Sequence, residues 1–235
     1  MIGNLIFRHI TSAVNDLQQS PYLKEVIKIV STAKSGKHIK EIVCFGLGQI
    51  SVCNISRYQL AFLLCLKDIY KPRSVLVHDP IFFKGECDVL KQFGLEVIEQ
   101  NNEGSYIISD SGITLVYLPH CPKQLTNNFL WSNWSFNIQN CIIIGNSFNS
   151  IIENNPSRLL LETVPYIYKL HPYTIESVLI NNFKYTDIFN DTSLHSFPKE
   201  KLEQVPKGYW DKGIKPSYEN IEEFITSHMV EKLNI

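Results

Sequence analysis

Four short polar motifs each follow directly on an apolar segment of strand length. The motifs are Gly46-Leu47-Gly48, His78-Asp79-Pro80, Pro119-His120-Cys121-Pro122 and Gly145-Asn146-Ser147-Phe148. In an open α/β sheet the carboxyl ends of the parallel strands line one crevice, and ligands bind there. The four motifs therefore predict one shared site at this edge of the sheet.

Length and composition indicate one folded domain. The chain has 235 residues, of which 44% are hydrophobic, and a domain of this size buries roughly 70% of the surface that its unfolded chain exposes. We expect a single domain over 1–235. It comprises an N-terminal helical cap at 1–36, a core at 40–197 and a C-terminal tail with a helix at 198–235.

Apolar periodicity predicts alternating strands and helices after two cap helices in 1–35. The expected strands are 40–45, 74–78, 95–99, 113–118 and 141–145, and the expected helices are 56–70, 84–93, 123–134, 154–170, 172–182 and 218–233. Residues 101–112 predict a hairpin or surface loop, and the alternation in 185–197 predicts an antiparallel pair. This order favours an α/β, Rossmann-like, mainly parallel sheet with helices on both faces and a C-terminal antiparallel edge.

Charge and hydropathy argue against two kinds of partner. The net charge is −1, from 22 basic and 23 acidic residues, and no basic run is long enough to follow a phosphate backbone, so we expect no direct nucleic-acid binding. No apolar run approaches the ~20 residues of a membrane span, and no signal-peptide pattern is visible. We expect no membrane association. The six cysteines lack close pairing, which predicts free thiols in a reducing compartment.

Six short blocks along the core carry a family resemblance. They read VCFGLGQ, HDPIF, LVYLPHCP, NNFLWSNW, IIIGNSF and FNDTSLHSF. In this order, over about residues 40–197, they resemble the successive blocks of the sensitivity to red light reduced family. The resemblance implies a regulatory role: red-light signalling and clock input for plant members, and clock-gene expression, haem biosynthesis and cytoskeletal function for animal and fungal relatives. It implies no defined reaction.

The glycine motif is the first candidate for a binding loop. Gly46 and Gly48 would let the backbone approach a phosphate, ribose or methionine group closely, and a tight turn without ligand is the simpler interpretation. Asp79 could accept both ribose hydroxyls of a nucleotide or cap the turn before Ile81. It lies 31 residues after Gly48, against about 20 in the dinucleotide fingerprint. This spacing suits a methyltransferase-like sheet, with S-adenosylmethionine, better than NAD.

The segment with the clearest chemical potential is His120-Cys121. A histidine titrates near neutrality and could act as acid or base, so His120 is the candidate catalytic residue. Cys121, next to that imidazole and followed by Pro122, could be a low-pKa thiolate or a haem ligand, and a rigid structural turn is the alternative. Asn146 ends the fifth strand and is a further ligand-binding candidate. Too few nitrogen and sulfur ligands converge here for a metal, and we expect none.

These observations predict a regulatory protein of the sensitivity to red light reduced family, cytoplasmic and also nuclear. It would act in circadian clock input or clock-gene expression and in haem-biosynthesis control. The predicted ligand-binding residues are Gly46, Gly48, Asp79, His120, Cys121 and Asn146. An S-adenosylmethionine- or nucleotide-dependent small-molecule enzyme is the first alternative, and a protein-interaction scaffold is the second. The cofactor, with haem among the candidates, the regulatory protein partners and the presence of any enzymatic activity stay open at this point.

Overall fold

One seven-stranded sheet organises the molecule. The computed structural model describes every residue except 1, 219–220, 222–223, 228 and 230–235. The strands, in the order β3-β2-β1-β4-β5-β7-β6, are β1 (Ile39–Phe45), β2 (Ser74–His78), β3 (Glu96–Val97), β4 (Ile113–Leu118), β5 (Cys141–Asn146), β6 (Ile175–Val178) and β7 (Thr192–Ser196). Strands β1 to β5 pair in parallel, and β7 runs antiparallel to both β5 and β6. The predicted fold class is confirmed.

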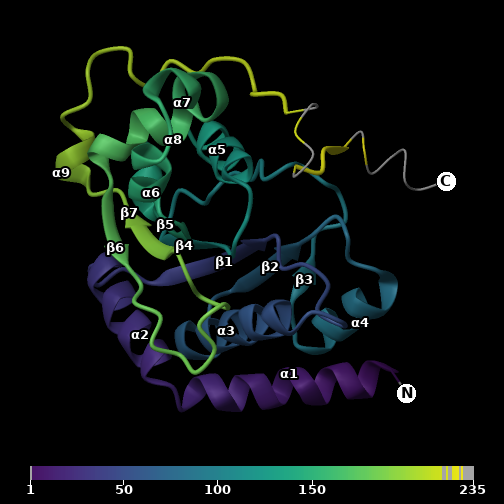
Figure 1. Ribbon diagram of the computed structural model, residues 1–235. Helices are drawn as coiled ribbons and strands as arrows, with labels where there is room; N and C mark the ends of the chain where they lie inside the picture. Colours follow the sequence, from purple (N-terminus) through teal and green to yellow (C-terminus); the bar gives the residue numbers. More distant parts are fainter. Residues whose placement is uncertain (1, 219–220, 222–223, 228, 230–235) are drawn as a thin grey trace.

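Helices cover both faces of this sheet (Figure 1). One layer holds α1 (Ile2–Gln18), α2 (Pro21–Ala33), α3 (Asn54–Tyr70) and α4 (Lys84–Gln92). The other holds α5 (Lys123–Ser132), α6 (Phe148–Glu153), α7 (Ser157–Thr163) and α8 (Pro165–Leu170). Shorter elements are the 3-10 turns η1 (Phe136–Asn140) and η2 (His171–Tyr173) and the helix α9 (Lys199–Leu202). No helix in the described part of the chain is long and apolar enough to cross a bilayer.

The central strands are apolar on both sides because each side meets a helix layer. In β1, Ile42 and Cys44 belong to the core beneath α1 to α4, whereas Val43 and Phe45 belong to the core beneath α5 and α8. Parallel strands covered on both faces read as continuous apolar runs. This explains why the local sequence predicted β1, β2, β4 and β5 well.

The N-terminal cap consists of two helices, as expected. Ser20 accepts a hydrogen bond from the Leu23 amide and Pro21 occupies the first turn of α2, so the second helix starts with a side-chain cap. The buried helix expected at 56–70 is α3, whose leucines from Leu60 to Leu66 lie in the core.

Two helix predictions after β5 are wrong. The expected helix at 154–170 is two short helices, α7 and α8, and Pro165 begins the second because proline lacks the amide that would continue the first. The expected helix at 172–182 is not formed, and the segment instead contains strand β6, which pairs with β7 in antiparallel register. The free energy gained from this pairing depends on a partner strand elsewhere in the sequence, and the periodicity of the segment itself contains no information about that partner.

Three further segments differ from the expectation. The strand expected at 95–99 shortens to the two residues of β3, and 101–112 is a loop without a strand. Only the second half of 185–197 is a strand, so the antiparallel edge consists of β6 and β7. Most of the helix expected at 218–233 lies outside the described residues, and the described positions from Tyr218 to Thr226 are not helical.

Candidate functional site

Three of the four polar motifs converge on one cavity at the carboxyl ends of β1, β2 and β4. The cavity measures about 210 Å³. Its lining includes five of the predicted site residues, namely Gly46, Gly48, Asp79, His120 and Cys121. Asn146, the sixth, is not part of the lining. The structure therefore brings five of the six predicted residues to one cavity, and the geometry of each side chain decides what this cavity can do.

Both glycines are required by close contacts within the chain. Gly46 and Gly48 have φ angles of +77° and +72°, in the left-handed region. A Cβ on Gly46 would lie 2.4 Å from the Cys121 sulfur, and one on Gly48 would lie 2.8 Å from the Ser56 hydroxyl oxygen. The missing side chains make room for the protein's own atoms, which supports the structural interpretation of this turn.

Two carboxylates already hold the amides of the glycine loop. Asp79 Oδ2 accepts a 2.7 Å hydrogen bond from the Gly48 amide, and Oδ1 accepts one from the Ile81 amide at 3.0 Å. Glu86, which is fully buried, accepts from the Ser51 amide at 2.8 Å. In nucleotide-binding loops such amides face phosphate oxygens. Here the carboxylates occupy that role, and their charge disfavours a second anion.

His120 links three segments. Gln59 Nε2 donates to His120 Nδ1 at 3.2 Å, and His120 Nε2 lies 3.1 Å from the Asn190 carbonyl, which only accepts. These partners assign the neutral tautomer with the proton on Nε2. Gln59 also donates to the Ile188 carbonyl at 3.4 Å. Both ring nitrogens are thus engaged within the chain, and His120 holds a left-handed backbone, φ +48°.

Cys121 is a buried thiol. Burial, with the nearby Asp79 charge, raises the pKa of Cys121 above its ordinary value. The sulfur donates to the Phe45 carbonyl at 3.1 Å, so the group is a neutral donor at physiological pH. Asn146 lies outside the cavity lining and supports this turn, because its Nδ2 donates to the Cys121 carbonyl at 2.7 Å. This environment does not favour a thiolate nucleophile or a thiolate ligand for haem.

His78 is the polar side chain of the cavity that lacks a full set of partners. It is 6% exposed, and its Nδ1 lies 2.7 Å from the Ile98 carbonyl. The carbonyl only accepts, so Nδ1 carries a proton, and in the tautomer with that single proton Nε2 is an acceptor. Nε2 is buried and has no hydrogen-bond partner among the described residues. The sequence analysis did not select His78 as a site residue.

The C-terminal tail completes the cavity wall. Phe224 and Ile225 line the cavity, and Asn101 Nδ2 donates to the Ile225 carbonyl at 3.0 Å. Glu103 accepts from the Lys215 ammonium at 2.8 Å and from the Ser227 amide at 2.9 Å. These contacts bring the tail against the crevice, an arrangement that the tail's own composition did not indicate.

Comparison with known proteins gives the chain a family. The model of the SRR1 domain matches residues 13–196. The chain belongs to the SRR1 domain family. The predicted resemblance is confirmed, and the match extends it into the N-terminal cap.

Three relatives illustrate the range of this family. An SRR1-like protein of Mus musculus is 43% identical over 141 residues, or 59% of this chain and 56% of the mouse protein. An SRR1-like protein of Drosophila melanogaster is 30% identical over 215 residues, covering 90% of this chain and 75% of the fly protein. The Arabidopsis thaliana protein Sensitivity to Red Light Reduced 1 is 23% identical over 193 residues, covering 80% of this chain and 68% of that protein. The match therefore spans little more than half of the mouse protein. No solved structure matches the chain.

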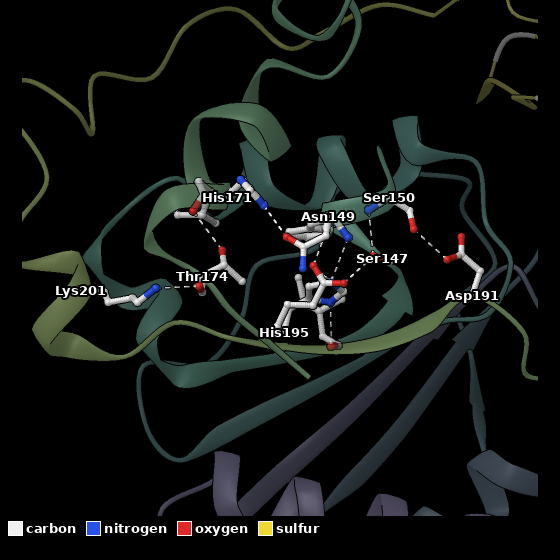
Figure 2. A network of polar contacts seen from close by, with 12 residues as sticks. Ser147, Asn149, Ser150, His171, Thr174, Asp191, His195 and Lys201 are labelled. Carbon is white, nitrogen blue, oxygen red and sulfur yellow. Dashed lines mark hydrogen bonds and ion pairs between the residues drawn. The ribbon is translucent and has the colours of Figure 1, made fainter. Parts of the chain in front are cut away.

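A second polar cluster of this SRR1 domain lies where β5, β6 and β7 meet α6 (Figure 2). Glu176 accepts from the Ser147 hydroxyl at 2.5 Å and from the Asn149 amide at 2.9 Å. His195, fully buried, lies 3.7 Å from the same carboxylate, and its ring stacks on Phe148. Burial raises the pKa of Glu176, but the neighbouring His195 and the hydrogen bond from Ser147 outweigh burial and hold the pKa at about 2.

This cluster satisfies the first amides of α6. The amides of Phe148, Asn149 and Ser150 are bonded to His195 Nε2, Glu176 and the Ser147 hydroxyl respectively. Its polar atoms are thus used in fixing α6 to the antiparallel edge.

Among the described residues, no group of three or more histidine, cysteine, aspartate or glutamate side chains is arranged to hold a metal ion.

The sequence analysis missed Glu176 and His195. Glu176 lay in a segment expected to be helical, where a carboxylate reads as solvent-exposed. His195 stood in the block FNDTSLHSF, whose alternation of apolar and polar residues marks a strand. The available signal was the position of His195 on the inward face of an expected strand, because a buried histidine needs hydrogen-bond partners.

Proposed function

We propose that this SRR1-family chain is a regulatory protein that works by binding a small molecule in the crevice at the carboxyl ends of β1, β2 and β4. The observation that carries this proposal is the 210 Å³ cavity. Its reactive side chains are bonded to partners inside the chain, while one buried nitrogen, His78 Nε2, has no partner among the described residues. Such a cavity is equipped to recognise a ligand and poorly equipped to transform one.

The biological setting is part of the proposal. Similarity to an Arabidopsis protein named for reduced sensitivity to red light supports a role in the response to light. The proposed clock input rests on the family resemblance, and the cytoplasmic and nuclear setting is proposed from the sequence. A role in haem-biosynthesis control rests on the family resemblance alone. Direct haem ligation by Cys121 receives no support, because that thiol is buried and donates to a backbone carbonyl.

The enzyme alternative is weaker. An acid or base must reach the proton that it transfers, and both nitrogens of His120 are engaged with Gln59 and Asn190. Cofactor-sized ligands occupy roughly 300–1,000 Å³, which exceeds the cavity. The strand order and the antiparallel β7 still resemble the methyltransferase sheet, a likeness of fold that does not carry function.

A variant that fills the cavity tests the proposal. Ile81 lines the cavity and is 42% exposed, so Ile81→Trp can add bulk there without entering the sheet core. Ile180, 71% exposed and outside the cavity, provides the matched control Ile180→Trp. Each variant replaces the natural gene in its own host, next to a deletion strain, and transcript profiles are recorded across a light and dark cycle.

We expect Ile81→Trp to reproduce the profile of the deletion and Ile180→Trp to match the wild type. Purified Ile81→Trp protein should keep its melting temperature within a few degrees. A normal transcript profile with a stable, cavity-filled protein would refute regulation through the crevice and favour the scaffold alternative.

A further inference from the structure

We propose that the crevice binds an uncharged ring compound of about ten non-hydrogen atoms, whose N–H or O–H group donates to His78 Nε2, and that it rejects phosphorylated compounds. The proposal rests on the proposed function, because it names the ligand class for that same cavity. Size, wall polarity and the charges around the glycine loop each limit the ligand independently.

Size sets the first limit. The cavity measures about 210 Å³ with Phe224 and Ile225 in place. A protein cavity of about 150 Å³ is known to hold benzene, so a fused bicyclic ring of nine or ten atoms is the appropriate scale. A complete nucleotide or S-adenosylmethionine is much larger and would require the tail to leave the crevice.

The wall sets the second limit. Apolar side chains dominate it, including Phe45, Ile81, Leu125 and Phe224, and such surfaces favour flat apolar ligands. Among the polar groups, Cys121 is engaged with the Phe45 carbonyl. The wall therefore favours ligands that present the flat face of a ring, and it offers few polar contacts.

His78 supplies the specific contact. Its Nδ1 donates to the Ile98 carbonyl, which fixes the orientation of the ring and leaves Nε2 as the acceptor of the singly protonated tautomer. Nε2 is shielded from water and unpaired within the described chain. A buried acceptor without a partner is unfavourable, and a ligand that brings one donor removes this penalty. A ligand without a donor leaves the acceptor unpaired, and the cavity discriminates against it.

Charge sets the third limit. Asp79 lines the cavity, and Glu86 lies behind the same loop, holding its Ser51 amide. Among the described residues, no lysine or arginine lines the cavity. An anion entering here would meet carboxylates at the position where nucleotide-binding loops offer free amides. Uncharged compounds are therefore favoured over phosphates and carboxylates.

Three matched probes test this assignment with the purified chain of residues 1–235. Indole has nine non-hydrogen atoms and one N–H donor, benzothiophene has the same shape without the donor, and indole-5-carboxylate adds an anion. Affinities are measured by calorimetry or by ligand-observed NMR. We expect indole to bind at least tenfold more tightly than either of the other two probes.

Variants assign the preference to His78. His78→Phe keeps an aromatic ring and removes the acceptor, so indole and benzothiophene should bind equally well to it. His38 is exposed and far from the cavity lining, and His38→Phe should keep the tenfold preference. If His78→Phe fails to fold, the wild-type ¹⁵N resonance of His78 Nε2 serves instead, and it should shift when indole is added.

Equal affinities for indole and benzothiophene, no binding of either, or an unchanged His78 resonance would each overturn the ligand class. The cavity-filling experiment in the host separates this failure from failure of the proposed function. If Ile81→Trp abolishes regulation while indole does not bind, the crevice is functional and only the assigned ligand class is wrong.

Discussion

Substitution of Gly46 by alanine tests whether this glycine makes room for the protein's own thiol. The new Cβ would lie 2.4 Å from the Cys121 sulfur, well inside contact distance, and the residue has a φ of +77°. The left-handed backbone costs an alanine about 1 kcal/mol. Overpacking in a rigid core costs about 1–3 kcal/mol more. We expect Gly46→Ala to lower the free energy of unfolding by about 2–4 kcal/mol.

Gly36 separates the two contributions. It has nearly the same φ, +75°, and a Cβ built there meets nothing within 4 Å. Gly36→Ala should therefore show the backbone cost alone, about 1 kcal/mol. Both variants are unfolded with urea and followed by circular dichroism.

A double-mutant cycle then isolates the contact. Cys121→Ala removes the sulfur that the Gly46→Ala methyl group would meet, so the double variant should be more stable than the sum of the two single losses predicts. Equal losses for Gly36→Ala and Gly46→Ala, or strictly additive effects in the cycle, would refute the idea that Gly46 exists to admit Cys121.

Three other predictions concern the titrating and bridging groups. The pKa of Glu176 is about 2 in the folded chain against an ordinary 4.5, so its stabilisation is present above pH 4.5 and is lost as the pH falls toward 2. Urea unfolding across this range should show a loss about 3 kcal/mol larger for wild type than for Glu176→Gln. His120→Ala removes hydrogen bonds to two segments and should cost about 1–2 kcal/mol, whereas the exposed His38→Ala should cost almost nothing; equal melting temperatures would contradict the bridging role. Iodoacetamide at pH 8 should label Cys53 before Cys121. Partial burial opposes the thiolate of Cys53, but hydrogen bonds from Ser56 and Ile55 outweigh it and lower the pKa of Cys53, whereas burial raises the pKa of Cys121. Mass spectrometry of the labelled protein gives the order of labelling.

The sequence predicted the parallel half of the fold because the signals there are local. Strands β1, β2, β4 and β5 are covered on both faces and read as continuous apolar runs, and a polar turn ends each one. The prediction failed at β6, whose partners in the antiparallel edge lie on β7. Pairing energy between distant segments leaves no periodic trace in either segment alone.

The sequence predicted which residues gather at one crevice, and tertiary structure decided which partners their side chains have. Gly48, Asp79, His120 and Cys121 were placed at one crevice by strand topology alone. Their hydrogen-bond partners lie 31, 61 and 76 residues away along the chain, for the pairs Gly48 with Asp79, Gln59 with His120, and Phe45 with Cys121. A catalytic histidine with a free ring nitrogen and a structural histidine with both ring nitrogens hydrogen-bonded are the same residue in the sequence. Only the partners that folding brings within hydrogen-bond distance distinguish them, and among the described residues that line the cavity these partners leave His78 Nε2 unpaired.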